Sequence, residues 1–66
     1  MQVVVNGENR ELAGEPTVRE LLEQLDLSGR RVAVEINREL VTRSLHETRR
    51  ICPGDVIEIV SLVGGG

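Results

Sequence analysis

The sequence contains no phenylalanine, tyrosine or tryptophan among its 66 residues. Proteins that bind single-stranded nucleic acid stack the bases on such side chains, and they bring positive charge to the phosphates. This chain instead has a formal net charge of −3 at pH 7. We therefore expect that nucleic acid is not a direct partner.

Lysine is absent as well, because all eight basic residues are arginines. The chain therefore has no side-chain amine that could form a Schiff base with a carbonyl substrate. It also has no lysine that could accept an isopeptide bond.

Cysteine and long apolar runs are scarce. Cys52 is the one cysteine, which excludes a disulfide within the chain and fits a reducing compartment. No apolar run reaches the roughly 18 residues of a membrane-spanning helix. The opening residues Met1-Gln2-Val3 lack the basic region of a signal peptide. We expect a cytoplasmic protein that does not enter a membrane.

The length predicts a single domain with a thin core, since a chain of this size buries only about 60% of its unfolded surface on folding. A deep active site would compete with that core, so we expect chemistry at an edge or at a terminus. His46 has no second histidine or cysteine at ligand spacing, which predicts no metal site. We expect neither an enzyme nor a bound cofactor, and a monomer when the chain is free.

Alternation of apolar and polar residues predicts strands at 1–6, 10–12, 31–36, 39–41 and 55–60. Asn6-Gly7 is typical of a hairpin turn between the first two strands. Pro53-Gly54 predicts a type II turn before the last strand, because proline presets φ and glycine accepts a positive φ.

One amphipathic helix is predicted to begin at Thr17, which stands three residues before Glu20 in the spacing of a capping box. Apolar residues follow at helical spacing, on the stripe Val18, Leu21, Leu22 and Leu25. Ser28-Gly29 is expected to end this helix. Ser44 and Glu47 repeat the capping-box spacing and predict a short helical turn between residues 42 and 50.

Together these elements predict an α+β architecture in which the helix packs across one face of a mixed sheet of four to five strands. A right-handed crossover places the first and last strands side by side at the centre of that sheet. This arrangement is a β-grasp fold. We expect one domain over residues 1–66, with residues 61–66 as a flexible C-terminal tail.

The tail ends in three glycines, Gly64, Gly65 and Gly66. Glycine loses more backbone entropy on ordering than any other residue, so the triplet does not serve stability. It provides a slender peptide that could thread a narrow channel and present a carboxylate that is ionised at pH 7. A frayed end or a cloning remnant is the alternative interpretation, since termini are commonly disordered.

A surface beside the tail is predicted from strand parity. If Ile57 and Ile59 face the core, the other face of the sheet carries apolar side chains that could dock a partner, namely Val4, Ala33, Val60 and Leu62. Glu35 and Glu58 on the same face could steer it toward a basic partner, although solvated charges are the simpler explanation.

The opening segment 1–7, the segment 17–22, the hairpin 32–37, the turn 53–55 and the glycine end together carry a resemblance to a known family. The chain resembles the bacterial sulfur carriers of thiamine biosynthesis, the ThiS-type proteins with a ubiquitin-like β-grasp fold. The resemblance covers nearly the whole chain, and the combination of length, element order and terminal glycines is what makes it specific.

The resemblance implies that an E1-like activating enzyme spends ATP to adenylate the carboxylate of Gly66. A sulfur donor protein, such as a cysteine desulfurase, then supplies sulfur and leaves a thiocarboxylate. Thiazole synthase finally draws that sulfur into the thiazole ring of thiamine. The carrier itself contributes no catalytic side chain.

The sequence is also compatible with other functions. The same tail chemistry could serve molybdopterin synthesis or tRNA thiolation. The chain could instead be a ubiquitin-like protein modifier that is joined to targets through Gly66. It could also be an interaction module with an inert tail.

Overall fold

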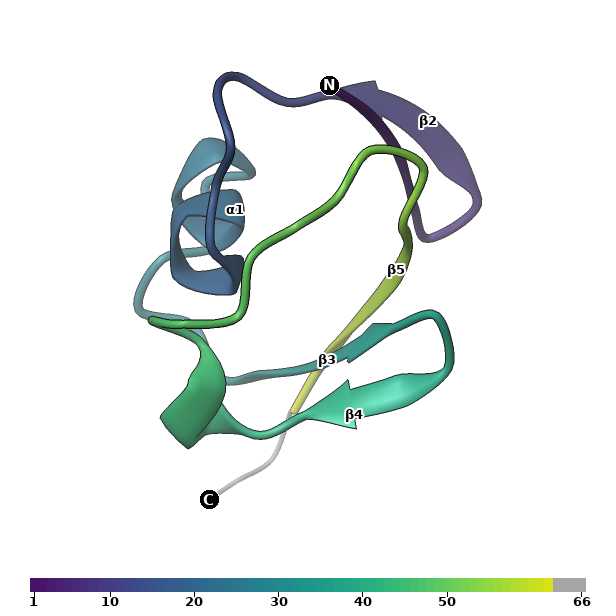
Figure 1. The fold of residues 1–66 in the computed structure, drawn as a ribbon. Helices are drawn as coiled ribbons and strands as arrows, with labels where there is room; N and C mark the ends of the chain where they lie inside the picture. The colour runs from purple at the N-terminus through teal and green to yellow at the C-terminus, as the bar shows by residue number, and fades with distance from the viewer. Residues whose placement is uncertain (63–66) are drawn as a thin grey trace.

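The computed structural model describes residues 1–62. Five strands form one sheet, with a helix and a 3-10 turn inserted between them (Figure 1). In chain order the elements are β1 (Gln2–Val5), β2 (Glu8–Glu11), α1 (Val18–Gln24), β3 (Val32–Ile36), β4 (Glu39–Val41), the 3-10 turn η1 (Arg43–Leu45) and β5 (Val56–Ser61). The predicted α+β β-grasp architecture is confirmed.

The strands lie in the order β2-β1-β5-β3-β4. The first and last strands, β1 and β5, are neighbours near the centre of the sheet, as predicted, and the structure shows that they run parallel. The other neighbouring pairs are antiparallel. The parallel pairing requires the long connection that contains α1, and this connection places the helix over one face of the sheet (Figure 1).

Both hairpins turn through two residues with positive φ. Asn6 and Gly7 have φ values of 50° and 82°, and Asn37 and Arg38 have values of 52° and 71°. Positive φ at both central positions is the signature of the type I′ turn, whose twist matches that of the flanking strands. The predicted turn at Asn6-Gly7 is therefore confirmed.

The capping box at the start of α1 is also confirmed. The backbone N–H of Glu20 donates to Thr17 Oγ1 over 3.2 Å, and the N–H of Thr17 donates to Glu20 Oε1 over 2.9 Å. The predicted end at Ser28-Gly29 is wrong, because the helix stops at Gln24. Asp26 adopts a left-handed φ of 62°, which breaks the helical hydrogen-bond pattern earlier than the glycine.

The predicted helical turn between residues 42 and 50 is the 3-10 turn η1. Its predicted cap is wrong: Thr42, not Ser44, is the N-cap, and its side chain makes no capping hydrogen bond. Ser44 lies inside the turn, and its hydroxyl is 3.3 Å from that of Thr42. A capping-box spacing therefore marked a turn here without forming the box.

The core lies between α1 and the face of the sheet that it covers. The side chains of Val18, Leu21 and Leu22 are buried there against residues from four strands and two connecting segments. The remaining buried apolar residues are Val3, Val5, Leu12, Val34, Ile36, Val41, Ile51 and Ile57. The opposite face of the sheet has no helix over it in Figure 1, and we call it the open face.

A network of backbone and side-chain hydrogen bonds fixes the start of β5. Gly54 has a φ of 84° and the N–H of Asp55 donates to the carbonyl of Cys52 over 3.0 Å, as the predicted turn at Pro53-Gly54 requires. The buried carboxylate of Asp55 accepts from the N–H of Cys52 and from the amide of Asn37, at 2.8 and 3.0 Å. Both ends of the turn are thereby held before the strand begins.

Within residues 1–62, no helix is long and apolar enough to cross a membrane.

Candidate functional site

The end of β5 is the root of the predicted tail. Ser61 is the last residue of β5 and pairs with Val32 of β3, and the N–H of Leu62 donates to the carbonyl of Arg31 over 2.9 Å. The sheet therefore extends past the predicted start of the tail at Ser61. The predicted tail-threading residues Gly64, Gly65 and Gly66 lie outside the described residues, and their roles stay predictions.

Two of the predicted docking residues meet beside this root. Val60 of β5 lies opposite Ala33 of β3, and both are on the open face. Val60 is 56% exposed and Leu62 is 53% exposed, while Ala33 is half-buried. Ala33 and Leu62 line the same groove. The structure thus gathers three of the four predicted residues near the point where the chain leaves the sheet.

Val4 is on the open face but does not join the other three. It pairs with Val56, at the beginning of β5. Val60 lies four positions after Val56, which corresponds to about 13 Å along a strand. Glu58 lies between them and pairs with Glu35 across β3, so an acidic pair divides the open face into two apolar regions. The open face therefore carries a tail-side region, formed by Ala33, Val60 and Leu62, and a separate region around Val4.

Leu40 belongs to the tail-side region and was missed by the sequence reasoning. It is 63% exposed and pairs with Glu35 on the open face. It also lines the groove that contains Ala33 and Leu62. The alternation rule could have found it, because Val41 is a core residue and its neighbour in β4 must face the other way.

The groove beside Leu62 runs between the residues that lead into β3 and those that follow β4. It is bordered by residues 28–33 on one side and by 40–44, 46 and 47 on the other. Arg19 and Leu22 of α1 also line it. We call this hollow the tail-root groove, since it opens where β5 ends.

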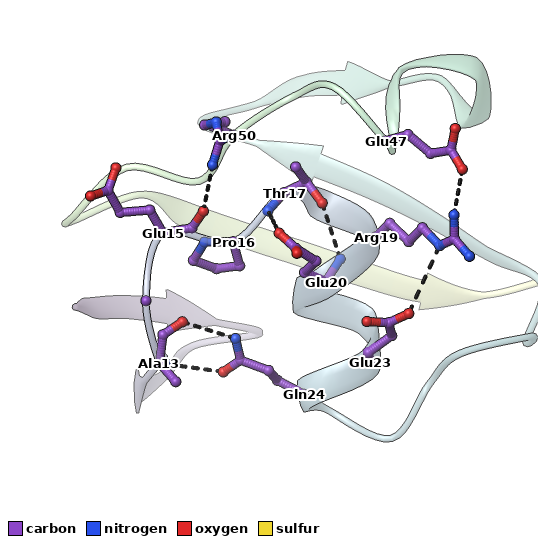
Figure 2. A pocket seen from close by; sticks show the side chains of 11 residues that line it. Ala13, Glu15, Pro16, Thr17, Arg19, Glu20, Glu23, Gln24, Glu47 and Arg50 are labelled. Atoms are coloured by element: carbon purple, nitrogen blue, oxygen red, sulfur yellow. Dashed lines mark hydrogen bonds and ion pairs between the residues drawn. The ribbon is translucent and has the colours of Figure 1, made fainter.

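A second hollow lies at the beginning of α1, and Figure 2 shows its side chains. Gln24 makes two hydrogen bonds with the backbone of Ala13, each of 3.0 Å. The guanidinium of Arg50 donates to the carbonyl of Glu15 over 2.8 Å.

Arg19 completes this network by pairing with Glu23 and Glu47 (Figure 2). These contacts link α1 to Ala13 and Glu47, and they link Glu15 to Arg50.

Cys52 is exposed, and its described contacts are those of the turn before β5. His46 lies in the tail-root groove with Nε2 3.1 Å from the carbonyl of Val41, to which a protonated Nε2 donates. Among residues 1–62, no group of three or more His, Cys, Asp or Glu side chains is arranged to hold a metal ion.

Comparison with known proteins identifies a family. The ThiS family model matches residues 3–66. The chain is 35% identical over 66 residues to the sulfur carrier protein ThiS of Escherichia coli, and the match covers 100% of both chains. It superposes with a TM-score of 0.85 and 32% identity on the crystal structure of the thiamine biosynthesis protein ThiS from Geobacter metallireducens, again over 100% of both chains.

A longer relative is a thiazole synthase of Paramagnetospirillum magneticum, to which the chain is 42% identical over 66 residues. The chain spans all of its own length in that match but only 20% of the length of the synthase. A segment similar to this chain therefore lies within a thiazole synthase polypeptide.

The family model covers nearly the whole chain, and the full-length relative carries the name of a sulfur carrier. The β-grasp fold and the full-length structural match agree with that assignment. The chain belongs to the ThiS family of sulfur carrier proteins, which are small carriers rather than catalysts.

Proposed function

We propose that this protein carries sulfur on the carboxyl group of Gly66 for the synthesis of the thiazole moiety of thiamine. The observation that carries the proposal is the family match, because it spans residues 3–66 and so includes the terminal glycines. The full-length match to the Escherichia coli sulfur carrier supports the same function.

The first step activates the carboxylate. One oxygen of the Gly66 carboxylate attacks the α-phosphorus of ATP on an E1-like adenylating enzyme, and pyrophosphate leaves. An ionised carboxylate is a poor electrophile, whereas the resulting acyl adenylate has AMP as a good leaving group. ATP is thus consumed by the partner, and the carrier binds no cofactor of its own.

The second step loads sulfur. Sulfur at the oxidation level of sulfide attacks the acyl carbon, the bond to AMP breaks, and a thiocarboxylate remains on Gly66. If a cysteine desulfurase delivers the sulfur as a persulfide, a thiol must supply two electrons and ends as a disulfide. The thiocarboxylate then holds a nucleophilic sulfur that thiazole synthase can use.

Thiazole synthase as the receiving enzyme is supported by the Paramagnetospirillum magneticum relative, in which a similar segment forms part of a thiazole synthase. The carrier acts in this scheme as a cosubstrate. Its folded body binds the partner enzyme. Gly64, Gly65 and Gly66 supply a peptide without side chains that passes through a narrow channel to the partner's active site.

Docking of the body is proposed for the tail-side region of the open face. Exposed apolar residues that cluster on a small protein often mark partner surfaces. Leu40, Val60 and Leu62 are exposed and lie close to Ala33 beside the root of the tail. Val4 is assigned a peripheral part of the interface, because the pair Glu35 and Glu58 separates it from the other residues.

Growth of a bacterial strain that lacks its own sulfur carrier tests the proposal. The wild-type chain should restore growth without added thiamine, and a chain without Gly65 and Gly66 should not. The deletion removes no residue of the described domain, so equal urea unfolding curves for the two proteins provide the control. Equal rescue by the shortened chain would contradict a role for the terminal carboxylate.

A further inference from the structure

Three of the four arginines that line the tail-root groove lie outside α1: Arg30, Arg31 and Arg43. We call them the root arginines. The pairing of Val32 with Ser61 brings the first two beside the end of β5. The pairing of Val34 with Val41 brings the residues after β4 to the same end of β3. Figure 1 shows that η1 and the beginning of β3 lie near the yellow end of β5.

The root arginines differ from Arg19, which lines the same groove. Arg19 pairs with Glu23 and Glu47. Among the residues that the structure describes, none of the root arginines forms an ion pair or donates a side-chain hydrogen bond. All three are exposed. An acidic protein with a net charge of −3 therefore presents a cluster of uncommitted positive charge at the root of its tail.

We propose that the root arginines bind carboxylates that surround the tail channel of the adenylating enzyme. This inference rests on the proposed function, because an enzyme that reaches Gly66 must bring the mouth of its channel against the end of β5. The side chains next to Leu62 are then the first to meet that mouth. A guanidinium presents its donors in a planar fork that matches a carboxylate, which makes arginine suited to this contact.

The charge pattern also orients the carrier. The positive end at the tail root faces the channel, whereas Glu35 and Glu58 place negative charge on the open face. A partner with an acidic channel mouth attracts the tail end first and repels the rest of this acidic chain. Charges at the rim of an interface act mainly on the association rate and its salt dependence, so the effect should appear there.

The test compares two sets of three neutral substitutions with the same change of net charge. One variant is R30Q/R31Q/R43Q at the tail root. The matched control is R10Q/R38Q/R49Q, at arginines that do not line the groove. Each set removes three positive charges and changes the formal net charge from −3 to −6. Urea unfolding curves for both variants establish that each has the wild-type fold.

Association of each full-length chain with the adenylating enzyme of the same organism is measured by stopped flow at several salt concentrations. At low salt, we expect the association rate constant of the root variant to be lower than that of the wild type by roughly tenfold or more. We also expect this rate constant to depend less on the salt concentration. The control should lie within about threefold of the wild type. Equal slowing by the two variants would overturn the proposal, because it would show an effect of net charge alone.

Two further readings separate the alternatives. Pyrophosphate exchange at a saturating concentration of the carrier measures adenylation. If the wild-type chain associates with the enzyme but gives no exchange, the proposed function is contradicted. The association rates of the variants still show whether the root arginines bind the enzyme. A titration with inorganic phosphate is followed by the amide NMR signals of residues 28–33 and 42–44. Saturable shifts that compete with enzyme binding would identify a site for a free anion and overturn the assignment to protein carboxylates.

Discussion

Val60 and Ala33 face each other across β5 and β3, on the side of the sheet that α1 does not cover. Val56 lies on the same strand and the same face, and its exposed fraction of 49% is close to the 56% of Val60. Val56 lies beside Val4 at the start of β5, whereas Val60 lies beside Ala33 near the tail. Substitutions at Val60 and at Val56 therefore distinguish a docking role near the tail from a general effect of changing the open face.

A polar side chain introduced at Val60 should weaken docking. We expect Val60→Gln to raise the KM for the carrier in adenylation roughly tenfold, about 1.4 kcal/mol, because a neutral amide would be forced into an apolar contact. Val56→Gln, the matched control, should change KM by less than about threefold. Steady-state pyrophosphate exchange measures both variants. Equal effects of the two substitutions would place the docking surface elsewhere.

The capping box of α1 predicts a measurable loss of stability. Thr17→Ala removes the acceptor for the N–H of Glu20 and should lower the free energy of unfolding by about 1 kcal/mol. Thr42 is the N-cap of η1 but makes no capping hydrogen bond. Thr42→Ala should therefore change stability by less than about 0.5 kcal/mol. Urea unfolding compares the two threonines, and a larger loss for Thr42 would refute the assignment of the caps.

The side chain of Asn6 extends the contact between the first hairpin and β5. Its amide donates to the carbonyl of Ile59 over 3.1 Å, and its Oδ1 accepts from the N–H of Ile59 over 2.8 Å. These bonds continue the pairing of β1 with β5 beyond Val5 and Ile57.

Replacing Asn6 by alanine should lower the free energy of unfolding by about 1–2 kcal/mol, because two hydrogen bonds are lost and the left-handed φ of 50° becomes less favourable. Asn9→Ala on the exposed strand β2 is the control and should cost less than about 0.5 kcal/mol. Thermal and urea unfolding of both variants measure the difference. Similar losses would show that the amide of Asn6 does not hold β5.

A cavity in the small core should greatly lower the free energy of unfolding. Leu21 is completely buried, and Leu21→Ala should cost about 2–5 kcal/mol. The total stability expected for a chain of this size is only roughly 3–10 kcal/mol, so a large unfolded fraction is expected at 37 °C. Leu40→Ala removes the same atoms from an exposed site and should keep the fold. Circular dichroism melts distinguish these outcomes.

The sequence predicted the elements whose signals are local. The capping box at Thr17, the turn at Asn6-Gly7 and the alternation along the last strand are each contained within a few residues. The end of α1 was missed because it depends on Asp26, a residue without the strong left-handed preference of glycine.

The arrangement of the site depends on register, which single strands do not reveal. Leu40 joins Ala33 and Leu62 only once β4 is aligned with β3. Arg31 precedes β3 and Arg43 follows β4, and they line one groove because β4 runs antiparallel to β3. The alternation of residues along a strand predicts which face of the sheet each side chain lies on. It does not predict which side chains of different strands are neighbours.

The central claim is that sulfur is held on Gly66. The most direct measurement is intact-mass and fragment analysis of the chain after incubation with the adenylating enzyme, ATP and a sulfur source. The account predicts a mass gain that corresponds to the exchange of one oxygen for one sulfur, localised to Gly66. Addition of a whole sulfur atom at Cys52, with an unchanged C-terminal fragment, would contradict it.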